Sequence, residues 1–237
     1  MKLPGLYHIF EEKWSQFQTC YIISDTHFGD IQLKENIANR PSDNDLIQLI
    51  NSRVGKKDIL LHLGDVGNIE HVRKIRGYKI LIMGNHDTGR TNYERKIIKE
   101  IFAYEKYTQE EVKEKICAKY PNCKLYITKG LAGWIATVDN GLFDEVYEGP
   151  LMIGEKLILS HEPLDCSWAF NIHGHNHFGN RVPIKTHLNV CSDVIKYTPL
   201  NLNNLLKTGL TSYITSIHRS TIDTATKRKQ KRTQKKK

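Results

Sequence analysis

The chain has 237 residues, of which 39% are hydrophobic and 26% are charged. This composition provides enough apolar material for a buried core and excludes a largely disordered chain. No stretch approaches the ~20 apolar residues of a membrane-spanning helix, and the N-terminal MKLPGLYHIFEEKW lacks the apolar run of a signal peptide. We therefore expect a cytoplasmic protein built on one large domain with an insertion or a tail.

The net charge of +9 is concentrated at the C-terminus. The last eleven residues, KRKQKRTQKKK, hold eight Lys or Arg and no acid, so subtracting eight from nine leaves +1 for residues 1–226. We expect residues 227–237 to be disordered, because like charges repel and bury nothing. Three roles stay open for this polybasic tail: a solvated extension, non-specific attraction to nucleic acid, and attraction to an anionic membrane surface.

Short apolar runs alternate with amphipathic segments along the chain. Continuous apolar runs of this length are typical of buried central strands, whereas capping-box spacing at Ser42 and Thr108 indicates helix starts. In chain order the pattern predicts a strand at 19–24, a helix at 42–54, strands at 58–63 and 78–83, a helix at 108–119, and strands at 156–160 and 169–172. These elements predict an α/β protein with a layered sheet.

Residues 88–140 differ in character from the rest of the chain. This segment is charged, is expected to be helical in its first half, and ends in Gly-rich sequence. We interpret it as a helical insertion in a domain that spans residues 1–226, and as a cap over the functional site.

Polar residues follow the predicted strands at the point where each strand ends. Because such strand ends meet at one edge of a sheet, these side chains are expected to gather there. They are Asp25, His27, Asp65, Asn85, His86, His161, His175 and His177.

The chemistry of this set indicates a metal site. It combines carboxylate, amide and imidazole donors, and the five cysteines of the chain form no CxxC pair. Such donors suit Mn²⁺, Fe, Zn²⁺, Co²⁺ or Ni²⁺ better than Ca²⁺ or a structural zinc site. Without His86, which directly follows Asn85, the set holds seven ligands. Seven are too many for one ion, but with one bridging carboxylate they suffice for two ions about 3.5–4 Å apart.

The same residues carry a family resemblance. Asp-Thr-His at 25–27, Gly-Asp at 64–65, Gly-Asn-His-Asp at 84–87, His161 and Gly-His-Asn-His at 174–177 resemble, in order, the five motifs of the calcineurin-like metallophosphoesterases. Each motif alone is weak, but five in the right order are specific. The context is similar to the small stand-alone bacterial and phage members, from about residue 19 to 206 outside the insertion. The resemblance implies a layered αββα fold, a two-sheet sandwich flanked by helices.

The resemblance also implies a role for each metal ligand. One metal would be held by Asp25, His27, Asp65 and His177, and the second by Asp65, Asn85, His161 and His175, with Asp65 bridging. Mn²⁺ is the metal we expect most, and a hydroxide that bridges both ions would attack phosphorus.

Three further residues are candidates for catalysis. His86 matches the family's non-ligand histidine and is expected to protonate the leaving alkoxide or stabilise its charge. Asp87 either orients that imidazole or caps a helix, and Arg40 is either a phosphate clamp or a surface arginine before a proline turn. His62, inside a predicted strand, is expected to be a core or supporting histidine rather than a ligand.

These features predict hydrolysis of a phosphodiester or a small phosphomonoester, which we slightly prefer to the reaction of a protein phosphatase. Two alternatives stay open: a nuclease recruited to nucleic acid by the tail, and a non-catalytic binding module on the same fold. The expected partner is the phosphoester substrate, and the sequence gives no indication of the oligomeric state.

Overall fold

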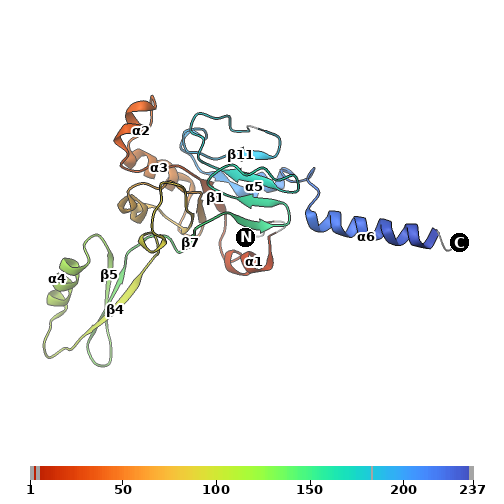
Figure 1. Cartoon of the computed structure of the whole chain (residues 1–237). Coiled ribbons are helices and arrows are strands. Elements are labelled where there is room, and N and C mark those ends of the chain that lie inside the picture. The colour runs from red at the N-terminus through yellow and green to blue at the C-terminus, as the bar shows by residue number, and fades with distance from the viewer. Residues whose placement is uncertain (1–2, 4–5, 183, 235–237) are drawn as a thin grey trace.

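The computed structural model describes residues 3, 6–182 and 184–234, and two of its three sheets form the body of the protein (Figure 1). The first sheet has the order β12 (Leu200–Asn201), β1 (Cys20–Ile23), β2 (Ile59–His62), β3 (Tyr78–Ile82) and β7 (Glu145–Tyr147). The second has the order β11 (His187–Asn189), β10 (Phe170–His173), β9 (Leu157–Leu159) and β8 (Leu151–Gly154). In each sheet the inner strands run parallel, and β12 and β8 are antiparallel edge strands.

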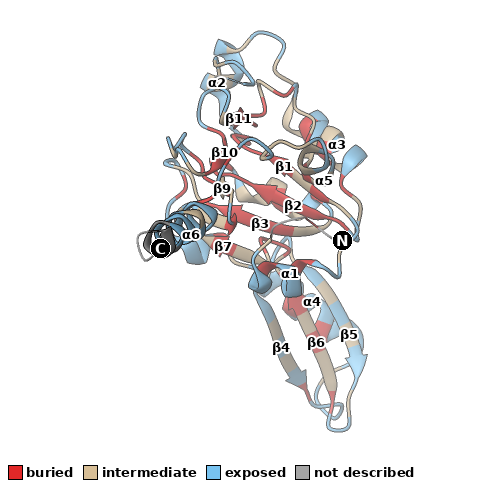
Figure 2. Cartoon of the chain, turned by 90° about the vertical axis from the view of Figure 1, so that its right-hand side faces the viewer, coloured by how far each residue is buried: buried red, intermediate tan, exposed pale blue. Residues whose placement is uncertain are grey.

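The two body sheets share one hydrophobic core. Strands β2 and β10 are buried at every position (Figure 2). Side chains of both sheets belong to the same apolar cluster. Helices α1 (His8–Trp14), α3 (Asp43–Arg53) and α5 (Leu202–Lys207) contribute Trp14, Ile50 and Leu202 to it. The remaining helical elements of the body are α2 (Ile31–Asn36) and the short 3₁₀ helices η1 (Ile69–Lys74) and η2 (Arg90–Asn92). The predicted α/β fold, with layered sheets flanked by helices, is confirmed.

The predicted helix starts are also confirmed. The Ser42 side chain accepts a hydrogen bond from the Asp45 N–H at the start of α3. Thr108 and Glu111 form the reciprocal capping box at the start of α4 (Gln109–Lys119). Each cap satisfies backbone donors that the first helical turn leaves unpaired.

The insertion at 88–140 contains α4 but also a third sheet that the sequence did not lead us to expect. Strands β4 (Ile97–Phe102), β6 (Trp134–Asp139) and β5 (Lys124–Lys129) form an antiparallel sheet in that order. With α4 it encloses a small apolar core of its own, made of Phe102, Val112, Ile116, Ala136 and Val138.

This insertion does not form the cap that we expected. Its root is anchored beside the start of β3, where the backbone N–H of Asp144 donates to the Lys79 carbonyl at 2.8 Å. The predicted site lies beyond the opposite end of β3, and the third sheet extends away from the body (Figure 1).

The polybasic tail also differs from the prediction of disorder. Helix α6 (Ile217–Gln234) includes residues 227–234 of the tail, whereas residues 235–237 lie outside the described part. The Ser216 hydroxyl accepts from the Arg219 N–H at 3.1 Å, and Arg219 pairs with Asp223 at 3.2 Å, one turn further on. A local cap and an i,i+4 ion pair therefore support the helix, which extends away from the body (Figure 1). In the described ranges, no helix combines the length and apolarity that crossing a bilayer requires.

His62 is a buried core histidine, as expected. Its Nε2 lies 2.9 Å from the Thr26 hydroxyl, which in turn donates to the Val66 carbonyl at 3.0 Å. Burial lowers the pKa of His62 from 6.5 to about 3, so the ring stays neutral inside the folded protein.

This depressed pKa predicts a pH dependence of stability. Between pH 6.5 and about 3 the unfolded chain binds a proton at His62 that the folded protein does not. The free energy of unfolding should therefore fall as the pH falls through this window, by up to about 1.4 kcal/mol per pH unit. His62→Gln should flatten that slope in urea unfolding measured from pH 7 to pH 4, and the exposed-site control His218→Gln should not. Equal slopes in the wild type and His62→Gln would contradict the prediction.

Candidate metal centre

The predicted site residues lie in loops that follow the strands of both body sheets. Asp25 and His27 follow β1, Asp65 follows β2, Asn85 and His86 follow β3, His161 follows β9, and His175 and His177 follow β10. Since β1, β2 and β3 are parallel neighbours, and so are β9 and β10, the two sheets deliver these loops to one common edge.

One group of donors consists of Asp25, His27 and His177. Their ligand atoms lie within 4.8 Å of one another, and His177 Nε2 is 3.6 Å from Asp25 Oδ1. Asp25 Oδ1 and His27 Nε2 are buried and have no hydrogen-bond partner among the described residues. Buried polar atoms without partners are costly, so their convergence points to a ligand that binds them.

A second group consists of Asp65, His161 and His175, again with ligand atoms within 4.8 Å of one another. The Asn85 side-chain oxygen lies 2.8 Å from His161 Nε2 and 3.1 Å from His175 Nδ1. The four residues therefore converge with an amide oxygen, a carboxylate and two imidazole nitrogens.

Asp65 stands between the two groups. Its Oδ2 lies 3.5 Å from His27 Nε2 in the first group and 3.3 Å from His161 Nε2 in the second. Burial alone would raise the pKa of Asp65, but the neighbouring imidazoles of His161 and His27 outweigh it and hold this pKa well below its usual range. The carboxylate is therefore ionised and faces both groups.

The backbone of these loops adopts conformations that most residues avoid. Asp25, His27, Asp65 and His175 have positive φ angles of 58°, 40°, 55° and 66°. Glycine is required where loops approach closely, because a Cβ on Gly174 would overlap Ser24 Oγ and Asp25 Oδ2. Strained backbone of this kind concentrates at functional sites.

The donor set fits divalent metal ions. It presents two carboxylates, one amide oxygen and imidazole nitrogens in two adjoining groups that share Asp65. Borderline divalent cations take such mixed oxygen and nitrogen donors. The assignment of each residue to a particular ion stays a prediction.

The family profile described as calcineurin-like phosphoesterase matches residues 19–189, more than half of the chain. The chain belongs to the calcineurin-like phosphoesterase family. The family predicted from the five motifs is thus confirmed.

No curated protein matches this chain. A solved structure of a protein of unknown function, AQ665 from Aquifex aeolicus, is similar at 21% identity with a TM-score of 0.49, covering 80% of this chain and 98% of that one.

Asp87 does not contact the His86 ring and does not begin a helix in this phosphoesterase. Its buried carboxylate accepts hydrogen bonds from the backbone N–H groups of Asp65 at 2.8 Å, Val66 at 3.0 Å and Gly84 at 2.9 Å. It therefore ties the loop after β2 to the loop after β3, and both roles expected from the sequence are replaced by this one.

Arg40 is not placed to clamp a phosphate. Its side chain is 4% exposed and its guanidinium lies 2.5 Å from Asp193. It also donates to the backbone carbonyl of Thr26 at 2.7 Å. Because these contacts hold the buried Arg40 side chain against the loop that carries Asp25 and His27, Arg40 positions that loop.

Asp193 is a site residue that sequence reasoning missed. Its Oδ2 lies 2.6 Å from His177 Nδ1, the ring nitrogen opposite the one that faces Asp25. Burial alone would raise the pKa of Asp193, but the bond from His177 and the charge of Arg40 lower it. A carboxylate on the far nitrogen fixes the tautomer and orientation of a ligating histidine. The available signal was the acidic residue in the closing segment NVCSDV.

We predict that Asp193→Asn lowers the affinity for the metal by about 10–100-fold, because His177 loses its orienting carboxylate. The matched control is Asp165→Asn, which removes a 90% exposed carboxylate that also lies beside a histidine, His187, at 3.3 Å. Isothermal titration of metal-stripped protein with Mn²⁺ measures both. Unchanged affinity in Asp193→Asn would contradict the orienting role.

Proposed function

We propose that the protein hydrolyses phosphoesters with two divalent cations, for which Mn²⁺ is the expected metal. The observation that carries this proposal is the pair of donor groups that share the Asp65 carboxylate. When bound, such ions neutralise phosphoryl oxygens and activate the water that attacks phosphorus. Asp25 and Asp65 are the anionic ligands among neutral donors, so the loaded site keeps a positive charge that attracts a phosphate ester.

The position of His86 supports a role at the leaving group. Its side chain is 69% exposed at the mouth of the site, and its Nε2 lies 4.0 Å from Asp65 Oδ2. The backbone N–H of His86 donates to Asp65 Oδ1 at 2.9 Å, which holds the main chain of His86 beside this carboxylate. We assign to His86 the proton transfer to the leaving oxygen.

The surroundings of the site favour a diester or a small monoester over a folded phosphoprotein. The cleft that Asn85 and His161 line has a volume of about 250 Å³. Clefts of this size accommodate small molecules or single chemical groups. We therefore prefer a phosphodiester or a small phosphomonoester to a phosphoprotein as the substrate.

Removal of the metal should abolish activity. We expect protein reloaded with Mn²⁺ to hydrolyse bis(4-nitrophenyl) phosphate and 4-nitrophenyl phosphate, and metal-stripped protein to hydrolyse neither. Asp65→Asn should lose at least one of two ions, as measured by elemental analysis, together with the activity. Asp165→Asn serves as the control. Two ions at full occupancy in Asp65→Asn would refute the shared-ligand assignment, and an inactive wild type with both ions bound would favour the binding-module alternative.

His86→Ala should separate metal binding from turnover. Because His86 is not among the expected ligands, both ions should remain while kcat falls by roughly 10²–10⁴-fold. His218→Ala, at an exposed position, should change neither quantity. A kcat within twofold of the wild type would remove His86 from the mechanism.

A further inference from the structure

Arg40 is buried between two segments that carry metal ligands. It lies in the connection between α2 and α3, and its side chain is 4% exposed. Burying a charge is costly unless the charge is paired and hydrogen-bonded. The contacts of the guanidinium group therefore show which parts of the protein it holds together.

On one side the guanidinium group holds the loop that follows β1. Its Nη2 donates to the backbone carbonyl of Thr26 at 2.7 Å and to that of Asp25 at 3.3 Å. The backbone here is strained, since Asp25 and His27 have φ angles of 58° and 40°. The two bonds thus restrain the loop at the residues whose side chains belong to the first donor group.

On the other side the guanidinium group holds the carboxylate behind His177. Its Nη1 lies 2.5 Å from Asp193 Oδ1, and the other carboxylate oxygen, Oδ2, lies 2.6 Å from His177 Nδ1. The Tyr197 ring covers the guanidinium group, with 5.7 Å between the Arg40 Cζ and the ring centroid. Arg40 is thereby linked to all three members of the first donor group, to two through their backbone and to one through Asp193.

The second donor group is held by different contacts. Asp87 ties together the loops after β2 and β3, through bonds of 2.8 and 2.9 Å from their backbone N–H groups. His161 Nδ1 lies 2.8 Å from the Leu63 carbonyl. In the described part of the chain, the guanidinium group of Arg40 contacts no residue of this second group. Apart from the shared Asp65 carboxylate, the two groups are thus positioned largely by separate contacts.

We propose that Arg40 is a positioning residue for one cation of the pair: it sets the affinity of the first donor group and leaves that of the second nearly unchanged. Arg40 contacts no ligating atom, and it acts through the loop after β1 and through Asp193. Ligands that are held in place before the cation arrives need less ordering when it binds. The inference rests on the proposed two-cation function and adds that the two positions can be weakened independently.

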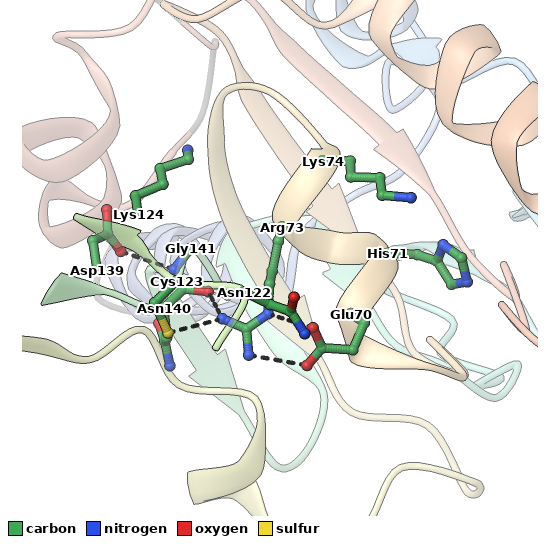
Figure 3. Close-up of a pocket in the computed structure, with 10 residues that line it drawn as sticks. All are labelled: Glu70, His71, Arg73, Lys74, Asn122, Cys123, Lys124, Asp139, Asn140 and Gly141. Carbon is green, nitrogen blue, oxygen red and sulfur yellow. Dashed lines mark hydrogen bonds and ion pairs between the residues drawn. The ribbon is translucent and has the colours of Figure 1, made fainter. Parts of the chain in front are cut away.

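Arg73 offers a matched control for Arg40. Its guanidinium group makes two 3.0 Å hydrogen bonds to the Glu70 carboxylate and also donates to the Asn140 backbone carbonyl (Figure 3). Like Arg40, it therefore joins a carboxylate and a backbone carbonyl from separate segments. In the described ranges, however, the Glu70 carboxylate has Arg73 as its partner and no histidine lies behind it.

The test measures the affinity of each cation separately. Metal-stripped, full-length wild type, Arg40→Gln, Arg40→Lys and Arg73→Gln are titrated with Mn²⁺ by calorimetry. Thermal unfolding of the metal-free proteins verifies that each variant is folded. Arg40→Lys carries the test if Arg40→Gln does not fold, because it keeps a positive charge beside Asp193 but lacks the planar fork that bonds a carboxylate and carbonyls together.

A parallel titration with Zn²⁺, followed by ¹⁵N NMR of the histidine rings, assigns the weakened site. In Arg40→Gln the signals of His27 and His177 should respond at higher Zn²⁺ concentrations than those of His161 and His175. In the wild type the two pairs should respond closer together. A loss of stability alone would shift all four histidines alike.

We expect Arg40→Gln to lower one Mn²⁺ affinity by about 10–100-fold and Arg40→Lys to lower the same affinity by a smaller factor. The second affinity should change by less than about threefold, a small effect that passes through Asp65 and through the bond from the His175 N–H to Asp25 Oδ2 at 2.9 Å. Arg73→Gln should leave both affinities as in the wild type.

Equal losses at both positions, or unchanged affinities in both Arg40 variants, would overturn the inference, and so would an equal loss in Arg73→Gln. The proposed function is tested in the wild type alone, by the binding of two cations and the turnover of bis(4-nitrophenyl) phosphate. Its failure is therefore seen without any variant, whereas a failure confined to this inference is seen only in the variants.

Discussion

The Asp65 carboxylate is the group on which the geometry of the site depends. One of its oxygens faces a histidine of each donor group, at 3.5 and 3.3 Å, and the other accepts the backbone N–H of His86 at 2.9 Å. Its own N–H is bound by Asp87. A single side chain thus sets the spacing between the two donor groups and the position of the residue assigned to proton transfer. This explains why the loops after β1, β2, β3 and β9 must reach the same edge of the sandwich.

Bringing these loops together requires unfavourable backbone conformations, each of which costs about 1–3 kcal/mol. The surrounding contacts offset that cost. Asp87 accepts from three backbone N–H groups, and the Asp25 carbonyl accepts from the Ser192 hydroxyl at 2.7 Å. Below the loops, β2 and β10 are buried at every position. The rigid core and these polar ties hold the ligand atoms close to one another before any cation binds, which reduces the ordering that binding requires.

The strands that the sequence predicted correctly are those with apolar residues at nearly every position, as expected for buried strands. Continuous apolar runs predicted β1, β2, β3, β9 and β10, and the residues that follow them supplied the family motifs. Strands β4 and β5 were missed because they alternate exposed and half-buried positions, and their exposed positions include lysines that read as surface. Arg40 and Asp87 were assigned the wrong roles for another reason: a sequence gives the type and order of side chains but not their direction. Both point into the protein and bind backbone atoms, and Asp193 was missed because its partner His177 lies 16 residues away.

The insertion is a separately packed unit of the chain. It begins at Thr88, encloses an apolar core of its own, and ends before β7. None of the expected metal ligands belongs to it. It is tied to the body through its root, where Arg95 binds Asp139 and Asp144 at 2.6 and 2.5 Å and the buried Lys79 ammonium donates to the Gly141 carbonyl at 2.7 Å. Because the two apolar cores share no residue, the packing beneath the ligand loops does not include the third sheet.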